Sequence, residues 1–403
     1  MAGGQISQSP VDFHRRPYNT TVRACDFESF LTPLEHVKAT NLIDEHRECG
    51  FACHRVSLYP EYQTDPLVYS GPGVMDKFYE PVIRESEVIA DILANYRDMT
   101  PLTATEQTDY DETTKCGECG GAFTKSNHKV RHHDHVTGQY LFPACNSCNL
   151  TLKIPNRKRK VTQKQVQNKK LKFDGDMEWA KDKYAKNFFL PLVFHNLKSY
   201  DAHFVIKHFK KQYTARCRDQ DIDDDICEQE EESVSYGDIH VTPLNGEKYL
   251  SFRVGNLRFI DSFQFLSTSL DNLVSLLLKS GRDKFTHTTK FLRDDDLVFA
   301  KGVYPYSYMT GPEKFTKTQL PLIEAFHNTL EDESSPPKYH DRVCEIWAHY
   351  DMKTMQNCHD HYLLPDVLLL ADVFENFRNS IYEQHRLDPV SYTHLTLPTI
   401  YSV

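Results

Sequence analysis

Residues 188–210 read FFLPLVFHNLKSYDAHFVIKHFK, and in this stretch a short apolar segment, a turn and an amphipathic segment follow one another directly. The apolar segment Phe188–His195 has the length and composition of a buried strand. The segment after the turn has helical periodicity, and its apolar face is formed by Phe204, Val205, His208 and Phe209. Asp201 lies where the turn meets the helix, a common place for a site residue in α/β sheets. The stretch therefore predicts an α/β fold.

Strand and helix patterns alternate on both sides of this unit. TTVRACDF (20–27) reads as a strand and SEVIADILANY (86–96) as a helix, and further strands are expected at 238–244, 248–254 and 257–261. Asn245-Gly246 predicts a hairpin between the first two of these. A long helix is expected from about Asp360, with Pro365 in its first turn. These elements also predict an α/β domain.

The composition indicates a globular intracellular protein with unevenly distributed charge. The chain has 403 residues, 39% of them hydrophobic, which is enough for two or three domains with sizeable cores. No run approaches the roughly 18 apolar residues of a membrane helix, and the N-terminus lacks the apolar core of a signal peptide. The net charge of −10 conceals a basic stretch at 151–172, which could contact nucleic acid, and an acidic stretch at 221–232, which is expected to be a loop.

Four carboxylates on three segments could form a site for two divalent cations. Asp26 and Glu28 are two residues apart in a strand, so both side chains point to the same face. Tyr362 and Asp366 are four apart in a helix and share one side of it. Together with Asp201, these carboxylates could hold two metal ions that clamp the attacking and leaving oxygens in phosphodiester hydrolysis. Taken singly, each has an ordinary explanation, since Asp201 could be a helix N-cap and Tyr362 a core tyrosine.

The order of these residues resembles the three exonuclease motifs of family-B DNA polymerases. The motifs are D-x-E in VRACDFES (22–29), N-x-x-x-Y-D in FHNLKSYDAHF (194–204) and Y-x-x-x-D in HYLLPDVLLLADVFENF (361–377). The resemblance covers most of the chain, from about Arg23 to Pro389. It is closest to the protein-primed branch, which includes the polymerases of Polinton/Maverick-type transposons and related viruses. KGVYPYSYM (301–309) also looks like that branch.

The resemblance implies a ribonuclease-H-like 3′–5′ exonuclease domain, in which a mixed central sheet is flanked by helices. Two Mg²⁺ or Mn²⁺ ions would be held by Asp26, Glu28, Asp201 and Asp366. Tyr362 would orient the attacking water, and Asn196 would contact the single-stranded 3′ end of the DNA. The implied partners are a primer-template and a terminal-protein primer, and in a eukaryotic host the protein would be nuclear.

Two C-x-x-C pairs give the strongest chemical signal in the sequence. A tetrahedral Zn²⁺ requires four thiolates, and the two pairs, separated by 25 residues, supply them as Cys116, Cys119, Cys145 and Cys148. The other seven of the 11 cysteines are scattered, which favours a metal site over a disulfide framework. The pairs therefore predict a structural zinc site.

The residues around the second pair resemble the recombination endonuclease VII group of His-Me nucleases, in which zinc staples a ββα module. The resemblance rests on HHDHVTG (132–138) and on Cys148-Asn149. It implies that His133 activates water and that Asn149 helps to hold a catalytic Mg²⁺. His132 stands where the family usually has Asp, and imidazole is also a metal ligand. His135 could support the site. The alternative is a zinc-stapled DNA-binding knuckle without cleavage activity.

The two resemblances together divide the chain into four parts. Residues 1–105 and 187–390 would form the exonuclease domain, 106–186 the inserted zinc module with its basic linker, and 391–403 an atypical tail. The linker contains the run Arg157, Lys158, Arg159 and Lys160. This run could follow the DNA backbone, act as a nuclear import signal, or be no more than a solvated linker.

The polymerase palm is not recognisable in the sequence. His54 stands where a D-x-x-S-L-Y-P motif needs its Asp, and Tyr236-Gly237-Asp238 lacks the second acid of a D-T-D-like strand. We therefore expect a family-B polymerase chain, nucleotidyltransferase by parentage, that stops before the palm and has exonuclease activity but no DNA synthesis. The alternatives are a His-Me endonuclease that cuts branched or nicked DNA, and an inactive transposon-derived DNA-binding protein.

Overall fold

The computed structural model describes the parts of the chain that carry most of the expected elements, namely residues 21–33, 44–57, 59–94, 97–134, 136–151, 189–208, 240–243, 249–292, 296–299, 302–326, 337–385 and 388–390. They form two units, which we call the sheet unit (Thr21–Val82 with Pro191–Val403) and the cysteine unit (Ile83–Leu190). None of the described helices combines the length and the apolar character that a membrane span requires.

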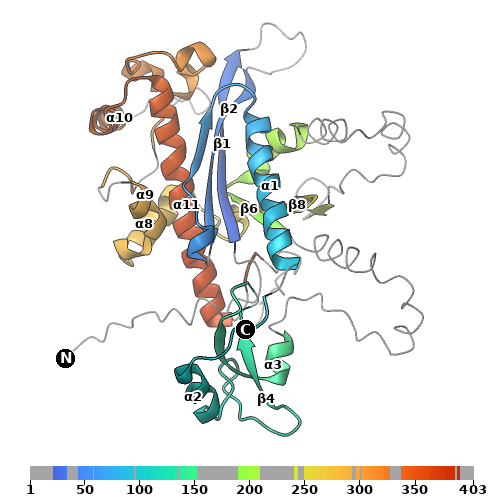
Figure 1. Ribbon diagram of the computed structural model, residues 1–403. Coiled ribbons are helices and arrows are strands. Elements are labelled where there is room, and N and C mark those ends of the chain that lie inside the picture. The colour runs from blue at the N-terminus through green and yellow to red at the C-terminus, as the bar shows by residue number, and fades with distance from the viewer. Residues whose placement is uncertain are drawn as a thin grey trace, which may run out of the picture. The chain divides into compact units, whose positions relative to one another are not determined.

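A seven-stranded mixed sheet forms the centre of the sheet unit (Figure 1). In spatial order its strands are β3 (Leu67–Ser70), β2 (Asp44–Ser57), β1 (Thr21–Pro33), β6 (Leu190–Phe194), β9 (Leu257–Asp261), β8 (Tyr249–Val254) and β7 (His240–Pro243). β1 pairs antiparallel with β2 and parallel with β6. All five residues of β6 are buried, as its apolar sequence predicts. The expected α/β class is therefore confirmed.

Helices cover both faces of β1. On one face Ala24 packs against Leu363 and Val367 of α11 (Met355–His385). On the other, the Phe27 ring packs against Phe78 of α1 (Val74–Ala94) and against Phe204. Figure 1 shows α11 and α1 on opposite sides of β1 and β2. Because side chains alternate along a strand, Asp26 and Glu28 share the face of Ala24 and so lie on the α11 side.

α11 begins at Met355, five residues before the expected start at Asp360. The cause is a reciprocal cap, in which Asn357 N donates to Thr354 Oγ1 (3.3 Å) and Thr354 N donates to Asn357 Oδ1 (3.2 Å). Pro365 consequently lies inside the helix. The expected first-turn position of Pro365 is wrong, because the cap formed by Thr354 and Asn357 starts the helix at Met355, ten residues before Pro365.

Among the described residues of the sheet unit, three further α-helices follow β9. They are α8 (Leu270–Leu278), α9 (Thr286–Phe291) and α10 (Pro337–His349). Ser269 caps α8 by accepting a hydrogen bond from Asn272 N (3.3 Å). β7 and β8 pair antiparallel, and the hairpin expected at Asn245-Gly246 lies outside the described residues.

Besides the part of α1 from Ile83 to Ala94, the described residues of the cysteine unit form a helix, a two-stranded hairpin and a second helix. These are α2 (Ala104–Glu112), β4 (Lys129–His133), β5 (Tyr140–Cys145) and α3 (Asn146–Thr151). Thr103 and Glu106 form a capping box at the start of α2. α3 follows β5 without a loop, so Cys145 ends the strand and Cys148 lies in the helix. His135 and the basic run from Arg157 to Lys160 lie outside the described residues.

Candidate functional site

Three elements of the sheet unit carry the four candidate carboxylates. Asp26 and Glu28 lie on β1, Asp201 is the first residue of the helix 201–208, and Asp366 lies on α11. Glu28, Asp201 and Asp366 are 5%, 2% and 6% exposed, whereas Asp26 is half-buried. A buried carboxylate is costly in free energy unless hydrogen-bond donors or cations compensate its charge. The burial of three of these acids therefore requires compensation.

Asp201 is tied directly to β1 between the two acids of the D-x-E motif. The backbone N–H of Phe27 donates to Asp201 Oδ1 at 3.2 Å. Burial, and then the charges of Asp26 and Glu28, raise the pKa of Asp201 well above its usual range. Asp201 is thus close enough to both acids to be repelled by them. Oxygen donors that are buried together and repel one another fit a divalent cation.

Two tyrosines join Glu28 to α11. Tyr306 donates to Glu28 Oε1 (3.2 Å), and its hydroxyl lies 2.8 Å from that of Tyr362. Because the single proton of Tyr306 goes to Glu28, Tyr362 is the donor between the two hydroxyls. Burial, and then the charges of Asp366 and Glu28, raise the pKa of Tyr362 well above its usual range, so it remains a neutral phenol. Tyr306 was not among the expected site residues, and its only signal was its place in KGVYPYSYM.

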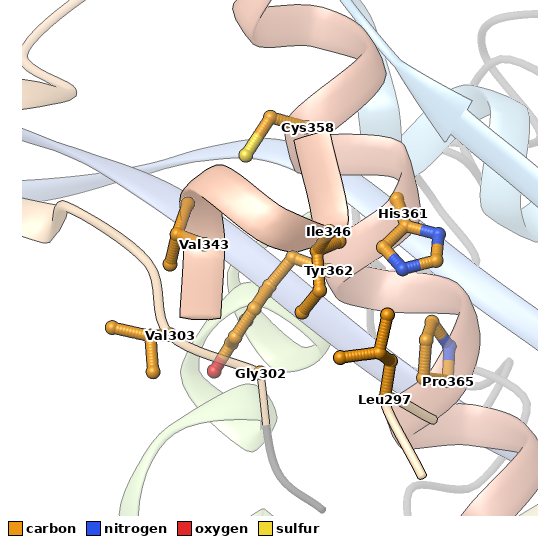
Figure 2. A pocket seen from close by; sticks show the side chains of 9 residues that line it. All are labelled: Leu297, Gly302, Val303, Val343, Ile346, Cys358, His361, Tyr362 and Pro365. Carbon is orange, nitrogen blue, oxygen red and sulfur yellow. The ribbon is translucent and has the colours of Figure 1, made fainter. Parts of the chain in front are cut away.

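A small cavity lies beside the Tyr362 ring. Its volume is about 30 Å³, enough for roughly two water molecules, and most of its lining is apolar, including Leu297, Val343 and Pro365. Figure 2 shows Tyr362 among these side chains and close to Gly302. A Cβ atom on residue 302 would lie 2.6 Å from Tyr362 Cδ2, so the close approach of the ring requires glycine there.

The loop that carries Asn196 is held by a buried acid from β9. Asp261 is 1% exposed and accepts hydrogen bonds from the backbone N–H groups of Asn196 (2.9 Å), Lys198 (3.3 Å) and Phe263 (3.1 Å). Asn196 is exposed and has a φ of 73°. That left-handed conformation is uncommon for a residue other than glycine, although Asn tolerates it better than most. Asp261 was also absent from the expected site, because nothing in LRFID shows which loop its carboxylate meets.

Replacing Asp261 with Asn is expected to loosen this loop. An amide in that position keeps one acceptor oxygen but turns its NH₂ group towards backbone donors. We expect hydrogen-exchange protection of the Asn196 and Lys198 amides to fall at least tenfold, because a hydrogen bond to a charged group contributes about 1.5–3 kcal/mol. Unchanged protection would show that the loop keeps its conformation without the Asp261 carboxylate. Asp65→Asn, at an exposed acid of the same unit, is the control.

In the cysteine unit, the four expected thiols come together. One ligand atom from each of Cys116, Cys119, Cys145 and Cys148 lies within 4.8 Å of all the others, and none is in a disulfide. A hydrogen bond from the Cys148 backbone lowers the pKa of Cys145 to about 7, whereas burial and the neighbouring Cys145 raise that of Cys148. Four thiolates at these distances need a cation between them. The cluster can therefore bind zinc, with ligands of the type that structural sites use.

Removing zinc from this cluster is expected to unfold the cysteine unit. We expect one equivalent of Zn²⁺ to be released when the thiols are blocked, and exchange of the β4 and β5 amides to rise sharply, because zinc binding supplies folding free energy in small domains. Cys119→Ser should lower the zinc content, while Cys344→Ser, at an exposed cysteine outside the cluster, should not. A chain that holds no zinc, or one in which the hairpin stays protected without it, would contradict this account.

The expected His-Me residues lie at the end of β4 and on α3. His132 Nδ1 lies 3.0 Å from Asn149 Oδ1, so these two candidate ligands are in contact. His132 is 8% exposed and His133 is half-buried. Asp134 accepts hydrogen bonds from the backbone N–H groups of Val136 (2.6 Å) and Thr137 (3.1 Å), which fixes the turn after β4.

The two candidate metal sites differ in how tightly their ligands are gathered. Among the described residues, the four cysteines are the only group of three or more metal-ligating side chains whose atoms all lie within 4.8 Å of one another. The four carboxylates are more widely spaced than this. Two effects explain the wider spacing of the carboxylates. The ligands of a two-cation site are spread around both ions, and carboxylates with no cation between them repel one another.

Comparison with known proteins identifies the family. The model of a family described as DNA polymerase type B, organellar and viral, matches residues 186–400, which include Asn196, Asp201, Tyr362 and Asp366. No match was found among curated proteins or among solved structures. The matched segment is more than half of the 403 residues and makes DNA the partner of the protein. The chain belongs to the organellar and viral type B DNA polymerases.

Proposed function

We propose that the chain is the 3′–5′ exonuclease region of a type B DNA polymerase and that it removes nucleotides from the 3′ end of DNA during replication. The observation that carries this proposal is the hydrogen bond from Phe27 N to Asp201 Oδ1, at 3.2 Å, between Asp26 and Glu28. It joins the D-x-E strand to the segment that carries the second motif. The mixed sheet with helices on both faces supports a ribonuclease-H-like fold.

The donor set fits two divalent cations. Asp26, Glu28, Asp201 and Asp366 offer only carboxylate oxygens, the ligands that Mg²⁺ and Mn²⁺ prefer. Two such ions would supply Lewis-acid stabilisation of the attacking and leaving oxygens in phosphodiester hydrolysis. The raised pKa of Asp201 supports this reading, because its charged form needs a cation to offset Asp26 and Glu28.

The side chains of the protein would orient the reactants. Tyr362 donates its proton towards Tyr306, which donates to Glu28, so the Tyr362 oxygen can accept a hydrogen bond from the attacking water. Its raised pKa keeps the phenol neutral at the pH of catalysis. Asn196, on the loop fixed by Asp261, would bind the single-stranded 3′ terminus.

A strand labelled at its 3′-terminal nucleotide tests this function. An exonuclease acting from the 3′ end releases the label as a mononucleotide in the first turnover, and chelation of Mg²⁺ or Mn²⁺ stops the release. Labelled products longer than one nucleotide would mean internal cutting, and a strand that stays intact in Mg²⁺ and in Mn²⁺ would contradict the proposal.

The cysteine unit supports a second candidate function, that of a His-Me endonuclease. The order β4, β5, α3 next to the four cysteines, together with the contact between His132 and Asn149, favours it. His133 would activate water, and His132 and Asn149 would hold one Mg²⁺. Internal cuts in a single-stranded circle that disappear in His133→Ala but persist in His128→Ala would support it, since His128 is an exposed histidine of the same unit. A circle that stays intact would contradict the endonuclease function and would favour the alternative, a zinc-stapled DNA-binding module without cleavage activity.

Several finer features stay predictions under this proposal. They are the protein-primed branch with its terminal-protein primer, a nuclear location in a eukaryotic host, and the boundaries at residues 105, 186 and 390. The DNA contacts of the basic run from Arg157 to Lys160 also belong here. These contacts would make affinity for DNA fall as salt concentration rises.

A further inference from the structure

A β-bulge lies in β2 opposite the D-x-E motif. Glu28 pairs with Gly50 and Ser29 pairs with Glu48, so Cys49 is an extra residue without a partner on β1. In a regular strand, residue 48 would share the face of Gly50, which is the α11 side. The bulge turns Glu48 away, so that its carboxylate meets His208 at 2.7 Å, and leaves Cys49 facing α11.

Cys49 contacts His359 of α11, whose side chain has no exposed surface. His359 Nε2 lies 3.2 Å from Cys49 Sγ, and Nδ1 lies 2.9 Å from Ser70 Oγ on β3. Ser70 donates its own proton to Asp360. Ser70 must therefore accept from His359 Nδ1–H, which leaves Nε2 to accept from the thiol of Cys49. Hydrogen bonds to Cys49 on β2 and to Ser70 on β3 thus fix the orientation and the tautomer of the His359 ring.

The backbone of β2 is shaped to admit this histidine. A Cβ atom on residue 50 would lie 2.4 Å from His359 Cε1, closer than any side chain permits. Glycine at position 50 therefore lets the helix approach the strand at the residue that pairs with Glu28. Cys49, Gly50 and Ser70 together define one position of α11 along the sheet.

The same histidine lies one helical turn before Tyr362. The ring of Tyr304 contacts both, since its centroid is 5.5 Å from that of His359 and 5.1 Å from that of Tyr362, on which it stacks. Tyr362 in turn meets Tyr306, which donates to Glu28. Any shift of His359 along β2 therefore displaces the phenol that faces the D-x-E acids.

We propose that His359 is a positioning residue for 3′ digestion: by bonding Cys49 and Ser70 it fixes α11 on β2 and β3 and thereby sets the place of Tyr362. This inference rests on the proposed exonuclease function. His359 is not one of the residues proposed to hold the metal ions or to contact DNA. Its contribution is geometric, and it is removed by changes that leave Tyr362 and all four carboxylates in the chain.

Two substitutions at position 359 test the role. His359→Leu keeps a buried side chain of good helix propensity but removes both polar contacts, whereas His359→Asn keeps an N–H that can donate to Ser70. The readout is the rate constant of a single turnover with enzyme in saturating excess, which unfolded molecules do not alter. We expect Leu to lower it at least about tenfold and Asn to lower it less, since small misplacements of catalytic groups are costly. His385→Leu, at the exposed end of α11, is the matched control.

A double-mutant cycle separates positioning from general weakening. If His359 acts through Tyr362, then His359→Leu in a Tyr362→Phe background lowers the rate constant by far less than it does in the wild type. Multiplicative effects, or a Leu variant as fast as the wild type, would overturn the inference. If the Leu variant does not fold, Ser70→Ala carries the same test with a smaller change. A wild type that leaves the 3′ end intact would instead overturn the proposed function, and this inference with it.

Discussion

Asp201→Asn is expected to lower the rate of 3′ digestion at least about 100-fold and, without divalent metal, to make the protein more stable than the wild type. Burial and the charges of Asp26 and Glu28 raise the pKa of Asp201, so the folded state favours its protonated form. Stability linked to that proton is complete below the unfolded pKa of about 3.9 and is lost as the pH rises through the raised folded value. Asn cannot ionise and can still accept from Phe27 N, so it avoids this loss.

The melting temperature and the rate of digestion measure both effects. At neutral pH without metal, the variant should melt above the wild type; this difference should shrink as the pH falls through the raised folded pKa of Asp201 and should be absent below the unfolded pKa of about 3.9. Added Mg²⁺ should stabilise the wild type more than the variant, because metal bound only to the folded state raises stability. Digestion should fall at least about 100-fold, since even residues behind a metal ligand contribute 10–100-fold. Asp65→Asn, at an exposed acid, should change neither quantity. A variant that is less stable than the wild type without metal would show that the acids do not repel one another.

Asp388→Ala is expected to destabilise α11 by about 3–5 kcal/mol, because it removes two hydrogen bonds from a buried charge and leaves Arg378 with Glu375 as its remaining carboxylate partner. Arg378 and Asp388 have side chains only 3% and 1% exposed, and they are joined by two hydrogen bonds, Nε to Oδ1 (3.0 Å) and Nη2 to Oδ2 (2.7 Å). Burial alone would lower the pKa of Arg378, but Glu375 and Asp388 raise it above its usual range. The pair ties the segment 388–390 to the C-terminal part of α11.

Hydrogen exchange of the α11 amides measures this loss locally. The large effect is expected because the guanidinium cannot lose its proton and cannot reach water from its present position. Asp65→Ala serves as the control for losing an exposed carboxylate. A loss of less than about 1 kcal/mol, the range of an exposed ion pair, would mean that water replaces Asp388.

The parts of the fold that are predictable from the sequence are those in which a single periodicity decides the structure. Side chains two apart on a strand must share a face, which placed Asp26 and Glu28 together on the α11 side of β1. The apolar run before Asp201 gave β6, because a strand buried on both faces shows no alternation. The four cysteines met as expected, since the spacing of metal ligands constrains a short segment strongly.

The missed features depend on contacts between segments that are distant in the sequence. Nothing in ECGF (48–51) shows that Cys49 is a bulge, because the register is set by the pairing of β1 with β2. Tyr306 reaches Glu28 only because the segment 302–310 folds back onto β1 and α11, and Asp261, at the end of β9, meets Asn196 just after the neighbouring strand β6. In contrast, the early start of α11 was readable from Thr354 and Asn357, and recognising their cap would have placed Pro365 correctly.

The most direct test of the central claim is digestion of a 5′-labelled single strand beside a closed single-stranded circle in Mg²⁺, with wild type and Asp26→Ala compared. The account predicts a ladder that shortens from the 3′ end with the wild type, no ladder with the variant, and an intact circle with both. A linearised circle without a ladder, or a ladder that survives Asp26→Ala, would contradict the assignment of the four carboxylates to a 3′–5′ exonuclease site.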